Sequence, residues 1–184
     1  MTTRFINGLA VEIDGKGEAL LCIHGLGGSS NTWTPLLAAL SSFKVIRPDL
    51  PGSARSALLA QPLSIEGYAA TLEALLAELG VESVHVMAHS LGTVVAQHLA
   101  VRNPGMIKSL ALFGPLVAPP EAARAAAARG GDQDGVAPPP NVAAMAARIN
   151  GSRQVVLEGC GHWTSFEKPQ RCMQELEQFH ASLR

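Results

Sequence analysis

The chain has 184 residues, 47% of them hydrophobic, and its 14 Lys and Arg against 15 Asp and Glu give a net charge of -1. This length and composition suit one globular domain, 1–184, with a substantial core. The charge favours neither nucleic acid nor an anionic membrane as a partner. No apolar run approaches a membrane span, no signal-peptide core opens the sequence, and three cysteines are scattered along it, so we expect a cytoplasmic protein.

The first forty residues predict a hairpin, a buried strand and a helix. Thr3–Ile6 and Leu9–Ile13 flank Asn7-Gly8, a dipeptide typical of two-residue hairpin turns. Ala19–Ile23 is continuously apolar, as in a strand that is buried on both faces. A helix is predicted over Asn31–Leu40.

The middle of the chain alternates strands with helices. Strands are predicted at Lys44–Arg47, Ser83–Ala88 and Ser109–Phe113. A helix capped by Ser64 runs to Leu79, and another helix follows the second of these strands. This alternation predicts a mostly parallel sheet with helices on both faces.

The pattern breaks after Gly114. Pro115–Gly131 holds an alanine and arginine run but no apolar stretch typical of a strand, so no strand is predicted there. A helix over about 139–149, a strand at Gln154–Leu157 and a final helix over Lys168–Leu183 complete the chain.

Ala88-His89-Ser90-Leu91-Gly92 has the form of a nucleophile elbow, in which a serine sits in a tight turn from strand to helix. The usual first glycine is replaced by Ala88, which is small enough to keep the turn. Such a turn exposes the Ser90 hydroxyl and places the next N–H at a helix start, where a developing oxyanion can be held.

Two downstream residues can supply the groups that a serine nucleophile needs. Ser90 is a poor nucleophile at its own pKa, and His162 can accept its proton and return it to the leaving group. Asp134 would hold the imidazole tautomer and stabilise the imidazolium, with Asp132 as the alternative acid. The order Ser, Asp, His along the chain is the order of the α/β-hydrolase fold.

The glycine-rich loop that follows Ala19–Ile23 is the candidate oxyanion loop. Its glycines let backbone N–H groups approach a bound group closely. The N–H groups of Leu26 and Leu91 are the expected oxyanion donors. His24, Gly25 and Gly27 are expected to support the loop.

Together these motifs resemble the α/β-hydrolase superfamily, and specifically its small esterase, enol-lactonase and C–C-bond hydrolase branch. The matching stretches follow the family order through nearly the whole chain: His24–Gly27, Asp49–Ser56, Ala88–Gly92, Gly131–Asp134 and Gly159–His162. The resemblance implies an α/β-hydrolase fold and a cofactor-independent serine hydrolase that cleaves a small-molecule ester or lactone through an acyl-enzyme. The alternatives are C–C-bond hydrolysis by the same residues, and a non-catalytic domain that binds a ligand.

Members of this superfamily carry a helical cap after the strand that matches Ser109–Phe113, and then a further strand before the Gly-Asp-x-Asp loop. Neither is predicted here, so 115–131 is interpreted as a remnant or junction of the cap region. Either the chain lacks the cap and that strand, or residues between about Ala122 and Gly131 are missing from the sequence. A Cα–Cα step well above the about 3.8 Å of a trans peptide would reveal the second case.

Other interpretations of these residues also exist. Ser90 could be an ordinary helix N-cap, and His162 a surface-loop residue. Cys22 and His24 could bind zinc together with Cys160 and His162 if the two loops met. Cys22 lies in a buried strand, however, where cysteine behaves as a small apolar residue. We therefore expect neither a metal nor a cofactor.

Overall fold

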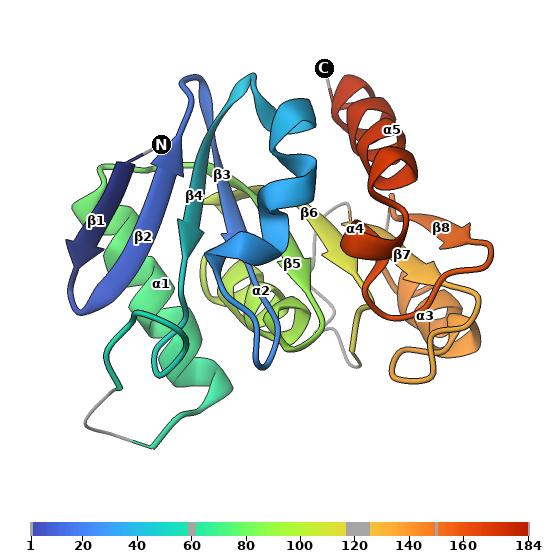
Figure 1. Cartoon of the computed structure of the whole chain (residues 1–184), viewed down its shortest axis with the longest axis horizontal. Coiled ribbons are helices and arrows are strands. Elements are labelled where there is room, and N and C mark those ends of the chain that lie inside the picture. The colour runs from blue at the N-terminus through green and yellow to red at the C-terminus, as the bar shows by residue number, and fades with distance from the viewer. Residues whose placement is uncertain (1, 59–61, 117–125, 150, 184) are drawn as a thin grey trace.

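A computed structural model of the chain describes residues 2–58, 62–116, 126–149 and 151–183. Its strands are β1 (Thr2–Ile6), β2 (Leu9–Asp14), β3 (Glu18–Ile23), β4 (Phe43–Pro48), β5 (Val84–His89), β6 (Ile107–Phe113), β7 (Ala126–Gly131) and β8 (Arg153–Leu157). They form one sheet in the order β1-β2-β4-β3-β5-β6-β7-β8 (Figure 1). β2 pairs antiparallel with β1 and β4, and all other neighbours are parallel, which confirms the predicted sheet.

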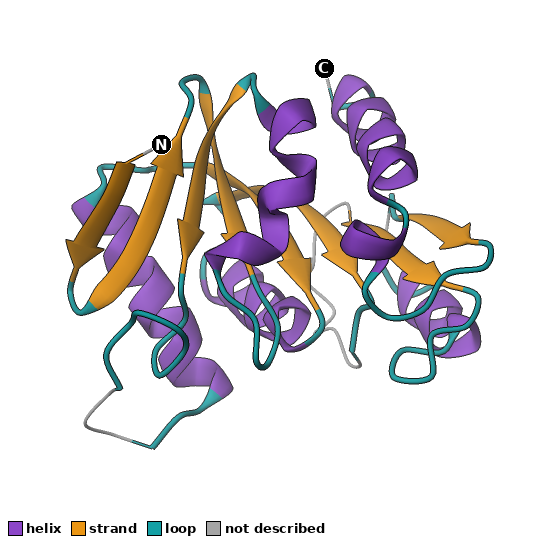
Figure 2. Ribbon diagram, viewed as in Figure 1, coloured by secondary structure: helices purple, strands orange, loops and turns teal. Residues whose placement is uncertain are grey.

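Helices cover both faces of this sheet (Figure 2). They are the 3₁₀ helix η1 (Ser30–Leu40) and the α-helices α1 (Ile65–Glu78), α2 (Leu91–Arg102), α3 (Pro139–Ala146), α4 (Thr164–Glu167) and α5 (Pro169–Ala181). α1, α2 and α3 pack on one face, and η1 and α5 on the other. Within the described ranges, no helix is long and apolar enough to cross a membrane.

The two faces enclose separate apolar clusters, and β5 contributes to both. Val84, Val86 and Ala88 pack on the side of α1 and α2, whereas Met87 packs on the side of η1. All six residues of β5 are buried. This alternation confirms the interpretation of the central apolar runs as strands buried on both faces.

Local sequence signals account for several element ends. Asn7 and Gly8 both adopt positive φ, 49° and 81°, as the two central residues of the hairpin turn require. Ser64 caps α1 by accepting a hydrogen bond from the Gly67 N–H, and Gly80 ends the helix at a φ of 64°.

The expectation that no strand lies between Gly114 and Gly131 is wrong. β7 occupies Ala126–Gly131 and pairs in parallel with β6 on one side and β8 on the other. Alanine and glycine carry little strand propensity, so the run gave no local signal. Its backbone is recruited by two neighbouring strands instead, which is a tertiary effect that periodicity does not detect.

The presence of β7 keeps β8 in its place at the edge of the sheet. Without β7, β8 would lie nearer β6 by about 4.8 Å, the spacing of neighbouring strands. Twelve residues separate Phe113 from Ala126, and the structure describes only 114–116 of them. The proposed test for missing residues covers 122–132, of which 122–125 lie outside the described residues and 126–131 form β7.

Candidate active site

Ser90 occupies a strained turn between the last residue of β5 and the first residue of α2. Its φ is 50° and its ψ is -121°, a conformation that residues other than glycine rarely adopt. The Ser90 N–H donates to the Phe113 carbonyl at the end of β6, 3.0 Å away. Ser90 is partly exposed, so the turn presents its side chain at the carboxyl edge of the sheet.

Glycines on two neighbouring segments make room for this turn. A Cβ on Gly25 would lie 2.8 Å from the Ser90 Cβ, and a Cβ on Gly92 would lie 2.5 Å from the Ile23 carbonyl oxygen. Side chains at either position would force the segments apart. The predicted oxyanion loop therefore lies directly against the predicted nucleophile.

His24 fixes the base of this loop with both ring nitrogens. Its Nδ1 is 2.7 Å from the Gly25 carbonyl oxygen, and its Nε2 accepts a hydrogen bond from the Leu50 N–H at 2.9 Å. This pattern corresponds to a neutral ring protonated at Nδ1, and burial lowers the pKa of His24 accordingly. The Gly28 N–H closes a turn around Leu26 and Gly27 by bonding the Gly25 carbonyl, while the Leu26 side chain is exposed.

Asp134 and His162 meet although 28 residues separate them. His162 Nδ1 lies 2.9 Å from Asp134 Oδ2 and 3.1 Å from Oδ1. Asp134 is buried, and its Oδ1 also accepts hydrogen bonds from the N–H groups of Val136 and Ala137. Asp132 instead accepts a hydrogen bond from the Cys160 N–H. The two candidate acids thus have different partners, and Asp134 is the one beside the imidazole.

His162 Nε2 is buried and has no hydrogen-bond partner. The hydrogen bond between His162 Nε2 and Ser90 Oγ is therefore not formed. The hydrogen bond between His162 Nδ1 and Asp134 is formed. Catalytic hydrogen bonds are often long in ligand-free enzymes and tighten when substrate binds. The arrangement leaves one imidazole nitrogen available as a proton acceptor.

Three residues outside the predicted catalytic set lie against the His162 loop. Glu167 accepts hydrogen bonds from the Gly161 and Trp163 N–H groups, on either side of His162. His89 Nε2 lies 3.0 Å from the His162 carbonyl oxygen. A Cβ on Gly114 would lie 2.8 Å from His162 Nδ1, so a glycine is needed there. The closeness of Glu167 to His162 in the sequence is the signal that could have indicated its contact with this loop.

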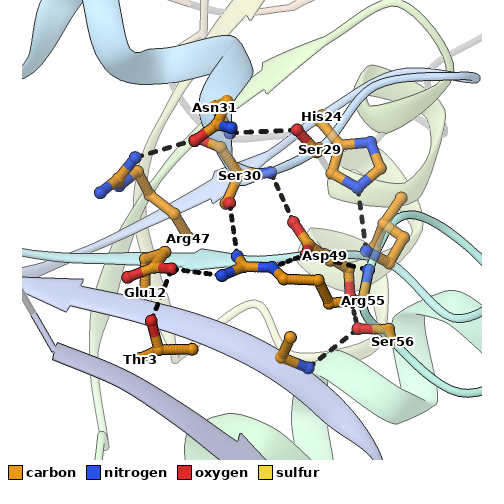
Figure 3. Close-up of polar contacts among 12 residues, drawn as sticks. Thr3, Glu12, His24, Ser29, Ser30, Asn31, Arg47, Asp49, Arg55 and Ser56 are labelled. Atoms are coloured by element: carbon orange, nitrogen blue, oxygen red, sulfur yellow. Dashed lines mark hydrogen bonds and ion pairs between the residues drawn. The ribbon is translucent and has the colours of Figure 1, made fainter.

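A buried charge network fixes the outer side of the oxyanion loop (Figure 3). Asp49 accepts the Ser30 N–H at 2.7 Å and the Arg55 Nε at 2.9 Å. Arg55 also donates to Glu12 at 2.7 Å and to Ser30 Oγ at 3.0 Å. One guanidinium thus joins β2, the start of η1 and the loop after β4.

Both carboxylates of this network are buried, with Asp49 0% and Glu12 1% exposed. Burial raises the pKa of Asp49, but hydrogen bonds from Ser30 and Arg55 outweigh it and bring the pKa below its usual value. For Glu12 too, burial raises the pKa, and hydrogen bonds from Arg55 and Thr3 outweigh it and lower the pKa. Both acids are therefore charged at neutral pH and depend on Arg55.

The structure disfavours a zinc site made of Cys22, His24, Cys160 and His162. Both nitrogens of His24 are hydrogen-bonded, and His162 Nδ1 faces Asp134. Burial raises the pKa of the Cys22 thiol strongly and that of Cys160 to about 11, so both thiols stay protonated. Among the residues described, no group of three or more potential ligands is placed to hold a metal.

Comparison with known proteins identifies the fold family. A family model for the alpha/beta hydrolase fold matches residues 18–130. An uncharacterized protein of Mycobacterium tuberculosis is 39% identical over 104 residues, which cover 56% of this chain but 30% of that protein. The chain thus spans less than a third of this relative.

Two solved structures share the fold over nearly their whole length. A thermophilic esterase from Thermogutta terrifontis has a TM-score of 0.89 at 19% identity, and the match covers 95% of this chain and 93% of the esterase. The enol-lactonase of Burkholderia xenovorans has a TM-score of 0.89 at 18% identity, with 98% of this chain and all of the enol-lactonase covered (100%). At these identities the likeness concerns the fold.

Replacing Arg55 tests the charge network. In Arg55→Ala, Asp49 and Glu12 would remain buried without their shared cation. The Arg55 side chain is itself 44% exposed, so solvent screens the pairs and the cost is about 1–2 kcal/mol, below that of a fully buried pair. We expect the free energy of unfolding, measured by urea titration at pH 7, to fall by about that amount. Arg4→Ala, at an exposed arginine of β1, is the matched control and should change it by less than about 0.5 kcal/mol. Equal stability of the two variants would contradict the role of Arg55.

Buried His89 predicts a loss of stability in acid. Burial lowers the pKa of His89 from 6.5 to about 4. Between these values the unfolded chain binds a proton that the folded chain excludes, so the free energy of unfolding falls as the pH drops from 6.5 towards 4. The slope due to one such group is at most about 1.4 kcal/mol per pH unit.

The variant His89→Gln isolates this contribution, because glutamine keeps an N–H donor for the His162 carbonyl but does not titrate. Urea unfolding at several pH values between 4 and 7 should give a shallower pH dependence for the variant than for the wild type. Identical pH dependence in both proteins would show that His89 is not the titrating group.

Proposed function

Because the chain belongs to the α/β-hydrolase family, we propose that it is a serine hydrolase that cleaves a carboxylic ester or lactone through an acyl-enzyme. The observation that carries the proposal is the hydrogen-bonded Asp134–His162 pair at the sheet edge where the strained turn presents Ser90. Family membership alone would not support this activity, because one fold serves many chemistries.

In the proposed reaction, Ser90 Oγ attacks the substrate carbonyl carbon while His162 Nε2 accepts the hydroxyl proton. Nε2 has no other partner, so it can take that role once the serine side chain turns towards it. Asp134 holds the proton on Nδ1 and stabilises the imidazolium that forms. The imidazolium then protonates the leaving alcohol, and water hydrolyses the acyl-enzyme by the same route in reverse.

The negative charge that develops on the carbonyl oxygen needs hydrogen-bond donors. We assign this role to the N–H groups of Leu26 and Leu91. Leu91 opens α2, and the first N–H groups of a helix have no partner within the helix. Gly25, next to Leu26, approaches Ser90 closely. One donor of this kind contributes about 3 kcal/mol of transition-state stabilisation.

A non-catalytic, ligand-binding α/β-hydrolase domain is the second candidate. The observation in its favour is that His162 Nε2 has no bond to Ser90 in the ligand-free chain. C–C-bond hydrolysis would use the same three residues with a different substrate pocket. Whether Ser90 acts as a nucleophile distinguishes the non-catalytic binding domain from both kinds of hydrolase.

Turnover of a chromogenic short-chain ester, such as p-nitrophenyl acetate, tests the proposal. Ser90→Ala should lower kcat/KM by at least about a thousandfold, because loss of the nucleophile removes the acyl-enzyme route. Ser152→Ala is a control outside the catalytic set, since the Ser152 hydroxyl donates to the carbonyl of Ala146, the last residue of α3. Turnover that is unchanged in Ser90→Ala would end the proposal.

A further inference from the structure

A second candidate binding site lies at the opposite end of the strands from Ser90. A partly open cavity of about 310 Å³ is bordered by β3, β5 and β6, the last turn of η1 and the end of α5. Ser90 follows the carboxyl end of β5, whereas His85, the second residue of β5, lines this cavity. Small-molecule sites begin at about 300 Å³, so the space suits a small ligand.

The cavity wall is mainly apolar. Six of its lining residues are buried hydrophobic side chains that come from the sheet and from both helices: Leu20, Leu40, Met87, Ala111, Leu176 and Phe179. Phe43 adds an aromatic ring whose centroid is 4.5 Å from that of His180 and 5.6 Å from that of His85. Such a wall binds the apolar body of a ligand.

One polar pair interrupts this wall. His85 Nδ1 and Ser109 Oγ share a hydrogen bond of 2.8 Å, and the two residues face each other on β5 and β6. Both are buried and both line the cavity. The Ser109 hydroxyl can donate one hydrogen bond and accept two, so it has capacity left for a ligand.

The His85–Ser109 pair is better explained as part of a binding site than as a second catalytic set. Glu18 Oε2 lies 3.6 Å from His85 Nε2, which is too far for a hydrogen bond. Glu18 instead bonds Lys108. Ser109 lies inside β6, directly after an irregularity in the pairing with β5, and not in a turn from strand to helix. These contacts support ligand binding and not nucleophilic attack.

The charges around the cavity favour a neutral ligand. Among the described lining residues, Glu177 is the one with a formal charge at neutral pH, and it is exposed. Burial lowers the pKa of His85, so its ring is neutral. An anion would therefore lose its hydration without gaining a cation, which is strongly unfavourable.

We propose that this cavity binds a neutral, mainly apolar molecule that carries one hydroxyl or carbonyl group, with that group hydrogen-bonded to Ser109. At the about 30 Å³ that one water molecule occupies in the liquid, the cavity has room for about ten water-sized groups. The site uses none of the residues of the proposed catalytic set, so its test is independent of the test of the proposed function.

Binding of 2-naphthol to the full chain tests the proposal, with 2-naphthoate as the matched ligand that replaces the hydroxyl by a carboxylate. We expect saturable binding of 2-naphthol by calorimetry and at least tenfold weaker binding of 2-naphthoate. Amide NMR shifts caused by 2-naphthol should centre on Met87 and Ala111 rather than on Leu26 and Leu91. Absence of saturable binding, equal binding of both ligands, or shifts centred on the Ser90 loop would overturn the proposal.

Variants of the cavity wall provide a second test of the binding site. Ala111→Leu and Ala39→Leu each fill part of the cavity and should weaken 2-naphthol binding at least tenfold. Ala39 is only partly buried, so its variant should fold even if Ala111→Leu does not. Ala143→Leu makes the same change on the exposed side of α3 and should leave the affinity unchanged. Full affinity in folded Ala39→Leu would contradict the assigned site.

Discussion

The strained turn at Ser90 is the constraint around which the carboxyl edge of the sheet is arranged. A non-glycine residue in such a conformation costs about 1–3 kcal/mol and persists only where its surroundings hold it. Here the Ser90 N–H bonds the Phe113 carbonyl, and the Thr93 hydroxyl donates to the Ser90 carbonyl at 2.6 Å. Gly25 packs against the turn from the loop after β3. The proposed nucleophile is thus positioned by backbone packing alone.

Carboxylates that accept backbone N–H groups fix the loops around this turn. Asp49 holds the start of η1 next to the oxyanion loop, and Glu167 holds both sides of His162. Asp134 does the same for its own loop while it faces the imidazole. Such bonds to charged acceptors are about twice as strong as neutral ones. Each of these loops is therefore fixed in place by a charged side chain.

Sequence reasoning predicted the elements with strong local signals and missed those that depend on distant partners. The apolar runs, the Asn7-Gly8 turn and the Ser64 cap predict the strands and helices up to β6. β7 was missed because an alanine and glycine run becomes a strand only through its two neighbours. The choice between Asp132 and Asp134 also needed coordinates, since both lie in one loop and only contact with His162 separates them. The network around Arg55 also needs coordinates, because its two acidic partners lie on different segments.

Labelling by a fluorophosphonate probe, which reacts with activated serine hydroxyls, tests the central claim most directly. We predict one adduct per chain at Ser90, found by peptide mass spectrometry. We also predict that His162→Ala slows labelling by at least about a hundredfold, because the general base is lost. Labelling at another residue, or equal labelling rates for the wild type and His162→Ala, would contradict the assignment of Ser90 as a nucleophile activated by His162.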